Sequence, residues 1–272
     1  MKLKDLDSFS RDFSSSPKFP ILFMGHGSPM NALEENEFVQ GWKYLGKSLP
    51  KPKAILCISA HWETRGTFIT AMENPPTIHD FGGFPQSLFE VQYPAFGSPE
   101  LAHEIKKHIS IADIGLDLHW GLDHGAWSVI RHLYPMADIP ILEFSLDYTL
   151  DPQGHYQLAK ELSFLRDRGV LILASGNMVH NLARIQWNMP DQGYDWAEWA
   201  NLKMKEWIIS GDFSSLIQYN KAGREIQMAI PSPEHFLPLI YLLGMKGAEE
   251  PMEFINENVV WGSISMTSLK IG

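Results

Sequence analysis

Three histidines stand at points where apolar runs of this 272-residue chain end. His26 lies between two glycines in ILFMGHGSPM, His61 follows AILCISA, and His180 follows VLILASGNMV. A neutral imidazole is the commonest metal ligand in proteins, and it also gives and takes protons near neutral pH. No two histidines of the chain have the i, i+4 spacing of a compact helical zinc motif. A metal or acid–base site would therefore be assembled from segments far apart in the sequence.

For the other histidines, sequence position gives weaker support for a functional role. For His235 in SPEHFLP and His124 in LDHGAW, sequence position alone leaves a functional and a structural role equally open. His79 and Asp80 lie in the long loop ENPPTIHDFGGFPQS, where we expect them to shape a turn with the glycines that follow. The histidines expected to be solvated or satisfied inside the core are His103, His108, His132 and His155, and His119 is ambiguous.

Short apolar runs predict the buried strands that would carry these histidines, because strands covered on both faces are continuous in apolar residues. These runs are residues 20–25, 54–60, 67–72, 139–146 and 170–175. Residues 262–271 alternate in polarity and predict an edge or final strand. Gly25 and Gly27 let the backbone bend sharply beside His26 and leave room around its side chain.

Helix signals lie between the predicted strands. The sequence Ser-Pro-Glu at 98–100 combines a cap, a first-turn proline and an acid. A helix is predicted over 151–168, with Gly169 closing it. A second Ser-Pro-Glu at 232–234 predicts a helix through HFLPLIYLL, with His235 in its first turn and Pro238 kinking or splitting it. Residues 195–210 predict another helix, whose three tryptophans are spaced to share one side.

This alternation of strands and helices predicts a single α/β domain, with a central, mostly buried β-sheet and helices on both faces. In such folds, ligands bind outside the carboxyl ends of the strands. His26, His61 and His180 are therefore expected to meet at one edge of the sheet. Residues 1–19 are polar and predict a mobile N-terminal arm, which leaves 20–272 as the single folded domain.

Composition restricts the function classes. The formal net charge is −10, which disfavours a nucleic-acid partner. Cys57, the single cysteine, cannot form an intrachain disulfide and is expected in the core. No run approaches the roughly 20 apolar residues of a membrane span, and residues 1–20 lack the apolar region of a signal peptide. We therefore expect a cytoplasmic protein with no membrane partner.

Six ordered blocks together resemble a known family: GHGSPMNAL, SAHWETRG, PPTIHDFGGFP, LDHGAWSVI, SGNMVHNL and SPEHFLPL. They are similar to the 4,5-DOPA extradiol dioxygenase branch of the class III extradiol ring-cleaving dioxygenases, from about residue 20 onward. The resemblance implies an α/β fold and one mononuclear divalent metal, with iron(II) expected for turnover and zinc(II) as another occupant. It implies His26, His61 and His235 as metal ligands. It also implies His180 as the acid–base residue and His124 as a hydrogen-bond donor to substrate or oxygen.

The third ligand has an alternative. A better-known branch of this superfamily resembles the two-histidine, one-carboxylate triad, and Glu234 lies next to His235. Neighbouring helical residues point about 100° apart, so both side chains cannot address one metal equally. We favour His235, which leaves three neutral imidazoles and a site that also suits zinc. Whether His180 also ligates the metal is left open.

The resemblance implies that the protein opens the ring of a catechol such as L-DOPA with O2. The product would be of the muconic semialdehyde type (4,5-seco-DOPA from L-DOPA). The partners would be a small aromatic diol and O2, in a monomer or small homo-oligomer. Two other interpretations remain: a zinc-dependent hydrolase on the same three histidines, and a non-catalytic binding protein of the same fold. The physiological catechol and the regiochemistry of cleavage are left open.

Overall fold

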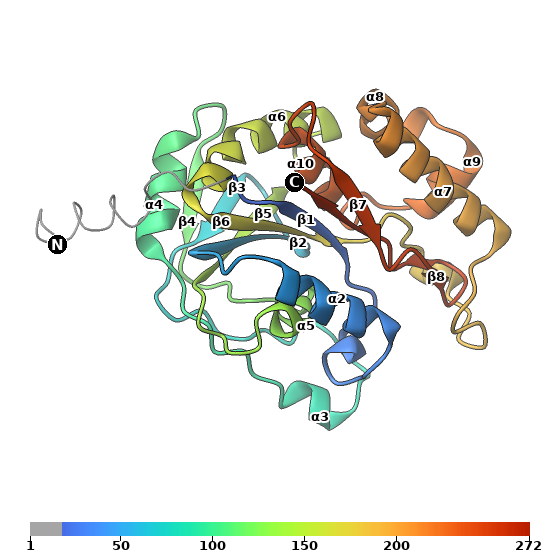
Figure 1. Ribbon diagram of the computed structural model, residues 1–272, viewed down its shortest axis with the longest axis horizontal. Helices are drawn as coiled ribbons and strands as arrows, with labels where there is room; N and C mark the ends of the chain where they lie inside the picture. Colours follow the sequence, from blue (N-terminus) through green and yellow to red (C-terminus); the bar gives the residue numbers. More distant parts are fainter. Residues whose placement is uncertain (1–17) are drawn as a thin grey trace, which may run out of the picture.

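The structure, a computed structural model, describes residues 18–272, and its centre is one mixed sheet of eight strands in the order β4-β3-β5-β2-β6-β1-β10-β7 (Figure 1). The strands β5, β2, β6 and β1 run parallel to one another in the middle of the sheet. The predicted α/β fold with helices on both faces of one sheet is confirmed. The strand bounds are β1 Ile21–Gly25, β2 Ala54–Thr64, β3 Thr67–Thr70, β4 Ile114–Asp117, β5 Ile141–Asp147, β6 Val170–Gly176, β7 Met252–Ile255 and β10 Ser268–Ile271, and a separate hairpin pairs β8 Val259–Val260 with β9 Ile264–Ser265.

Two apolar cores lie on the two faces of the sheet. One face packs against α2 (Glu37–Ser48) and α5 (His124–Leu133), and the other packs against α4, α6, α7 and α10. The strands between them bury every residue of β1, β5 and β6, which explains why their sequences are almost continuously apolar. The remaining helices are α3 Gln86–Phe89, α4 Pro99–His108, α6 Pro152–Leu162, α7 Asp195–Ser210, α8 Phe213–Ile217, α9 Arg224–Ala229 and α10 Leu237–Gly244, with 3-10 turns at Pro29–Ala32, Ser163–Arg168, Leu182–Arg184 and Tyr219–Lys221.

Several predicted helix ends are confirmed. The Ser98 side chain accepts a hydrogen bond from the Leu101 N–H at the start of α4. The Asp151 side chain does the same for the Gly154 N–H at the start of α6. The helix predicted over 151–168 ends as a 3-10 turn, and Gly169 closes it with a left-handed φ of 79°.

The turn before α10 differs from the prediction. Residues 231–236 form bends and turns, and α10 begins only at Leu237. His235 therefore lies in the turn that precedes the helix, and not in its first turn. Pro238 occupies the beginning of α10, where a missing N–H costs no hydrogen bond, so it neither kinks nor splits the helix.

The prediction for residues 262–271 is confirmed in part, because β10 is the final strand of the chain. The segment divides into β9 and β10, however, and β10 lies inside the sheet between β1 and β7 and not at an edge. The serines of residues 262–271 are buried, and their hydroxyl groups form hydrogen bonds within the protein. Ser265 Oγ donates to Asn201 Oδ1 at 2.7 Å, and Ser268 Oγ accepts from the Gly25 N–H at 3.1 Å. Alternation in the sequence therefore did not indicate a solvent-facing side.

Three smaller predictions can also be compared with the structure. Lys18 and Phe19 were assigned to the N-terminal arm, but Phe19 is buried and its N–H donates to the Arg166 carbonyl. The rest of that arm, residues 1–17, lies outside the described residues. The predicted tryptophan side of α7 is only partly formed, because Trp196 and Trp207 pack on the core while Trp199 is 46% exposed. Among residues 18–272, no helix has both the length and the apolar character required to cross a bilayer.

Candidate active site

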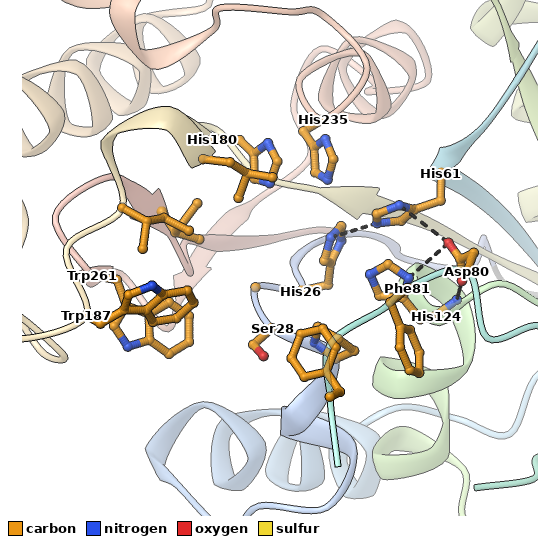
Figure 2. A pocket seen from close by; sticks show the side chains of 16 residues that line it. His26, Ser28, His61, Asp80, Phe81, His124, His180, Trp187, His235 and Trp261 are labelled. Carbon is orange, nitrogen blue, oxygen red and sulfur yellow. Dashed lines mark hydrogen bonds and ion pairs between the residues drawn. The ribbon is translucent and has the colours of Figure 1, made fainter. Parts of the chain in front are cut away.

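The five histidines singled out from the sequence line one cavity of about 290 Å³ at the carboxyl ends of the parallel strands (Figure 2). Five separate segments bring them there. They are His26 after β1, His61 in β2, His124 at the start of α5, His180 after β6, and His235 before α10. The convergence predicted for His26, His61 and His180 is confirmed, and the cavity adds the other two.

His61 lies inside β2 and not after it, as the sequence had suggested. The strand continues to Thr64, but its pairing with β5 is interrupted: Ile58 pairs with Phe144, and Glu63 pairs with Leu146. Five residue steps along β2 therefore match two along β5. Such a bulge redirects side chains locally, and here it carries His61 to the cavity.

The glycines beside His26 have a role different from the predicted one. Gly27 adopts a φ of 62°, which confirms the sharp bend. A Cβ on Gly25 would lie 2.6 Å from the carbonyl carbon of Met266, and a Cβ on Gly27 would lie 2.4 Å from the sulfur of Met266. The space that they leave is thus filled by Met266, which packs against the His26 loop. The two glycines therefore allow the close approach of Met266, and Gly27 also lines the cavity.

Three of the rings form a nearly equilateral triangle. The ring centroids of His26 and His61 are 5.0 Å apart, those of His61 and His235 are 5.0 Å apart, and those of His26 and His235 are 5.3 Å apart. His124 packs beside His61 at 3.9 Å, and His180 stacks on His235 at 3.5 Å with nearly parallel planes. The remaining two histidines therefore flank the triangle, each against one of its members.

A serine fixes the hydrogen position on His26. Ser175 Oγ donates to the carbonyl oxygen of Gly125 at 2.6 Å. Since that bond uses the only hydroxyl proton of Ser175, the oxygen accepts from Nδ1–H of His26, 3.0 Å away. The proton of the neutral ring is thereby on Nδ1, and the lone pair is on Nε2. Nε2 of His26 lies 3.2 Å from Nε2 of His61, and the two atoms face one another in Figure 2.

A carboxylate acts in the same way on His235, and a second carboxylate lies near His61 beyond hydrogen-bond distance. Glu234 Oε1 lies 3.1 Å from Nδ1 of His235, and Asp80 Oδ2 lies 3.6 Å from Nδ1 of His61. A carboxylate beside Nδ1 favours a proton on that atom and leaves Nε2 unprotonated. An Nε2 lone pair is thus favoured on His26 and on His235. Glu234 is turned toward the His235 ring and to Ser232 Oγ, which donates to it at 2.9 Å.

Burial keeps these rings neutral. Loss of solvation lowers the pKa of His26 and of His235 well below the usual value, and the neighbouring imidazoles lower it further. For the same reasons the pKa of His61 falls to about 3, with Asp80 opposing the shift. Burial also lowers the pKa of His180 to about 4. Neutral imidazole is the form that binds a metal ion, so the cluster is prepared for one at neutral pH.

The donor set fits one divalent ion. Two nitrogens about 2.1 Å from one tetrahedral ion lie about 3.4 Å apart, and the imidazole centroids around such an ion lie about 5 Å apart. The His26–His61 nitrogen distance of 3.2 Å and the centroid triangle both agree with these values. Among the described residues, two groups of side chains lie close enough together to hold a metal: His26, His61 and His124, and His180, Glu234 and His235. These groups divide the three ligands that the resemblance implies, because His26 and His61 fall in one group and His235 in the other.

Asp80 is a site residue that the sequence interpretation missed. It was expected to shape a turn, but its Oδ1 accepts from the backbone N–H of His124 at 2.9 Å. Its Oδ2 lies 2.9 Å from Nδ1 of His124, without the alignment of a hydrogen bond. Burial alone would raise the pKa of Asp80, but the contacts with His124 and His61 outweigh burial and lower it. The available signal was the block PPTIHDFGGFP, which already carried the family resemblance.

The remaining histidines lie outside the cavity. His79, next to Asp80, donates from Nε2 to the Val91 carbonyl at 2.9 Å, so its role is structural as predicted. His155 is buried beside the Tyr241 hydroxyl, and His132 bonds the Asn31 carbonyl. His103, His108 and the ambiguous His119 are exposed. Cys57 is buried in the core, as expected, where burial raises the pKa of its thiol well above the usual value.

The buried carboxyls of Asp123 and Glu143 lie next to the histidine cluster, and the sequence did not predict their role. Asp123 caps α5, which begins at His124, and accepts from Ser59 Oγ at 2.7 Å. Glu143 accepts from the Asp123 N–H at 2.7 Å and from Trp120 Nε1 at 3.2 Å. Burial raises the pKa of both carboxyls, so the pair is prone to retain a proton between its members. These contacts hold the start of α5 against β2 and β5.

Comparisons with known proteins indicate the family of this chain. The family described as the catalytic LigB subunit of aromatic ring-opening dioxygenase matches residues 20–271. A 4,5-DOPA dioxygenase extradiol of Escherichia coli (strain K12) is 44% identical over 264 residues, covering 95% of this chain and 96% of that protein. A protein of the same name from Beta vulgaris is 35% identical, covering 91% and 94%. The crystal structure of an uncharacterized Escherichia coli K12 protein superposes with a TM-score of 0.80 at 38% identity, covering 93% of this chain and 100% of the other.

Proposed function

This chain belongs to the family of the catalytic LigB subunit of aromatic ring-opening dioxygenases, and on that premise we propose that it opens the ring of a catechol such as L-DOPA with O2. The product is a muconic semialdehyde, which for L-DOPA is 4,5-seco-DOPA. The enzyme class, an extradiol ring-cleaving dioxygenase, follows from the family. The observation that carries the proposal is the triangle of buried imidazoles, in which Ser175 and Glu234 favour a lone pair on Nε2 of His26 and of His235.

In this proposal His26, His61 and His235 hold one divalent ion through Nε2. Iron(II) is the ion for turnover, and zinc(II) suits the same three nitrogens. A bound ion would supply a common site for the catechol oxygens and O2, which replaces a bimolecular encounter by a local one. Glu234 is assigned to orienting His235, because its Oε1 faces Nδ1 of that ring.

The flanking histidines are assigned to the substrate. His180 is neutral and lines the cavity beside His235, so it can take a proton from a catechol hydroxyl and return one to oxygen later. His124 donates a hydrogen bond to negative charge that develops on oxygen. Asp80 holds the backbone and ring of His124 in position for that contact.

The remaining parts of the proposal concern the whole chain. Residues 20–272 are the catalytic domain, which the match to the family over 20–271 supports. The expected partners are a small aromatic diol and O2. A cytoplasmic location and a monomeric or small homo-oligomeric state are part of the proposal on the grounds given by the sequence.

Oxygen uptake tests the proposal directly. Protein loaded with iron(II) without air should consume one O2 per L-DOPA and form a yellow semialdehyde. His235→Ala should abolish both, whereas His119→Ala, an exposed histidine outside the cavity, should change neither. Absence of uptake with every catechol tried would reject the dioxygenase assignment. Ester or amide cleavage by the zinc form without O2 would instead indicate the hydrolase, and catechol binding without either reaction would indicate a binding protein.

A further inference from the structure

We infer that Asp123 is a positioning residue of the metal site, which holds His61 at its distance from His26. This role rests on the proposed function, since both histidines are taken there as ligands of one ion. Asp123 caps α5 and does not line the cavity. It acts through the start of α5, residues 123–125, from which hydrogen bonds lead to both histidines.

Asp123 is linked to His61 by one hydroxyl group. Ser59 Oγ donates to Asp123 Oδ1 at 2.7 Å and accepts from the His61 N–H at 3.2 Å. The hydroxyl has a single proton, and its direction is fixed because Asp123 accepts it. This bridge lies where the pairing of β2 with β5 is irregular, between Ile58 and Glu63. The backbone of His61 is therefore held by the bridge at a point where the pairing with β5 does not hold it.

The start of α5 also contacts the ring of His61 and reaches His26. A Cβ on Gly125 would lie 2.8 Å from Cδ2 of His61, so the imidazole packs against the bare backbone of this glycine. The Gly125 carbonyl accepts from Ser175 Oγ, which bonds to Nδ1 of His26. The Nε2 atoms of His26 and His61 lie 3.2 Å apart. A shift of this turn would therefore change the distance between two proposed metal donors.

His124 is placed by the same turn, because it is the first residue of α5. Its N–H donates to Asp80 Oδ1 at 2.9 Å. Figure 2 shows its ring beside those of His26 and His61, and one nitrogen from each of the three lies within 4.8 Å of the others. One turn thus sets two proposed ligands and a histidine assigned to the substrate.

Asp123 is itself held by a second carboxyl group. Glu143 of β5 accepts from the Asp123 N–H at 2.7 Å, and Asp123 Oδ2 is buried without a hydrogen-bond partner among the described residues. Burial raises the pKa of both carboxyls, so a proton shared between them gives this oxygen a partner. An exposed aspartate is enough to cap a helix, as Asp151 does for α6. The burial of two carboxyls at α5 is therefore explained by the positioning role and not by the cap alone.

Zinc affinity tests this role, measured by competition with a chelator of known affinity. Ser59→Ala removes the bridge to His61 and leaves the cap of α5, so its zinc dissociation constant should rise about tenfold or more. Asp123→Ala should weaken zinc binding to at least the same degree. Asp123→Asn keeps an oxygen for Ser59 and turns an amide N–H toward Glu143, so it should restore zinc binding to within about threefold of wild type.

Asp151→Ala is the control, because it removes the corresponding cap of α6, where the side chain accepts from the Gly154 N–H at 2.8 Å. It should lower the melting temperature and leave zinc affinity unchanged. Wild-type zinc affinity in Ser59→Ala would overturn the positioning role, and so would equal weakening in Asp151→Ala. If Asp123→Ala does not fold, the comparison of Ser59→Ala with Asp151→Ala still decides.

Oxygen uptake with L-DOPA is measured separately on the iron-loaded proteins. If zinc affinity follows the expected order but no form cleaves a catechol, the proposed function fails and the positioning role of Asp123 stands. If the wild type cleaves L-DOPA but Ser59→Ala binds zinc as tightly as it does, the proposed function stands and the positioning role fails.

Discussion

Replacing Ser175 by alanine tests the hydrogen-bond argument for the metal site. Ser175 Oγ links the Gly125 carbonyl to Nδ1 of His26, and it is the only polar group described next to that nitrogen. Without it, the neutral His26 ring loses its preference for a proton on Nδ1, and the Nε2 lone pair is no longer assured. Outer partners of metal-bound histidines contribute about 10–100-fold to metal affinity. Ser175→Ala should therefore weaken zinc binding by that factor, or about 1.4–2.7 kcal/mol.

The substitution also affects stability, so a matched control is needed. Two polar groups lose a buried partner, which costs about 1–3 kcal/mol. Ser145 is an equally buried serine on β5, which β2 separates from β6, and its Oγ accepts from the Phe68 N–H at 2.8 Å and bonds to Thr64 Oγ1 at 2.6 Å. Ser145→Ala should lose comparable stability in thermal unfolding while keeping wild-type zinc affinity.

The assay is competition with a chelator of known zinc affinity, run on both variants at pH 7.5. Thermal unfolding of the metal-free proteins gives the stability loss separately. A Ser175→Ala protein that binds zinc within twofold of wild type would refute the assignment of Ser175 as the group that positions His26. Equal weakening in both variants would attribute the effect to general destabilisation.

Four further predictions concern the same cluster. His180→Ala should retain zinc but lose catechol turnover by 100-fold or more; loss of zinc in the chelator assay would make His180 a ligand. Glu234→Gln should keep zinc within a few-fold, because its amide oxygen can still accept from His235, whereas metal loss measured by the same competition would make Glu234 the ligand. Asp80→Asn should lower kcat by about 10–100-fold, measured by oxygen uptake, and an unchanged kcat would remove Asp80 from the site. The metal-free protein should lose stability as the pH falls from about 6.5 to 4, because the pKa of His61 and of His180 is depressed in the folded state and only the unfolded chain gains protons there. Each such histidine contributes a slope of about 1.4 kcal/mol per pH unit, and a flat profile of melting temperature over this range would contradict the neutral cluster.

The sequence predicted the fold well where local signals decide it. Continuous apolar runs located the parallel strands, and serine or aspartate followed by proline located the starts of α4 and α6. The failure at 262–271 has a tertiary cause, because its serines and threonine are buried against Asn201 and the end of β1. Nothing in the local alternation of that segment distinguishes such partners from water.

The site could be predicted only where a single segment of the sequence carries the signal. A histidine at the end of a buried strand is visible in one segment, as for His26 and His180. Ser175 and Asp80 act through partners 149 and 44 residues away, so their roles exist only after the segments meet. His235 was identified through the resemblance of its block to a family, since its position in a turn gives no signal of its own.

The pairing of β1 with β10 sets the earliest time during synthesis of the chain at which the histidine cluster can form. The Gly25 N–H, one residue before His26, bonds to the hydroxyl of Ser268, 243 residues further along the chain. At 5–20 residues per second, a ribosome takes about 12–50 s to synthesise that interval. During this time His26 and His61 are already made, but the strand that fixes the β1 end is missing. Assembly of the histidine cluster is therefore a late event in biogenesis, and we expect a deletion confined to β10 to disrupt the cluster while leaving all five of its histidines in place.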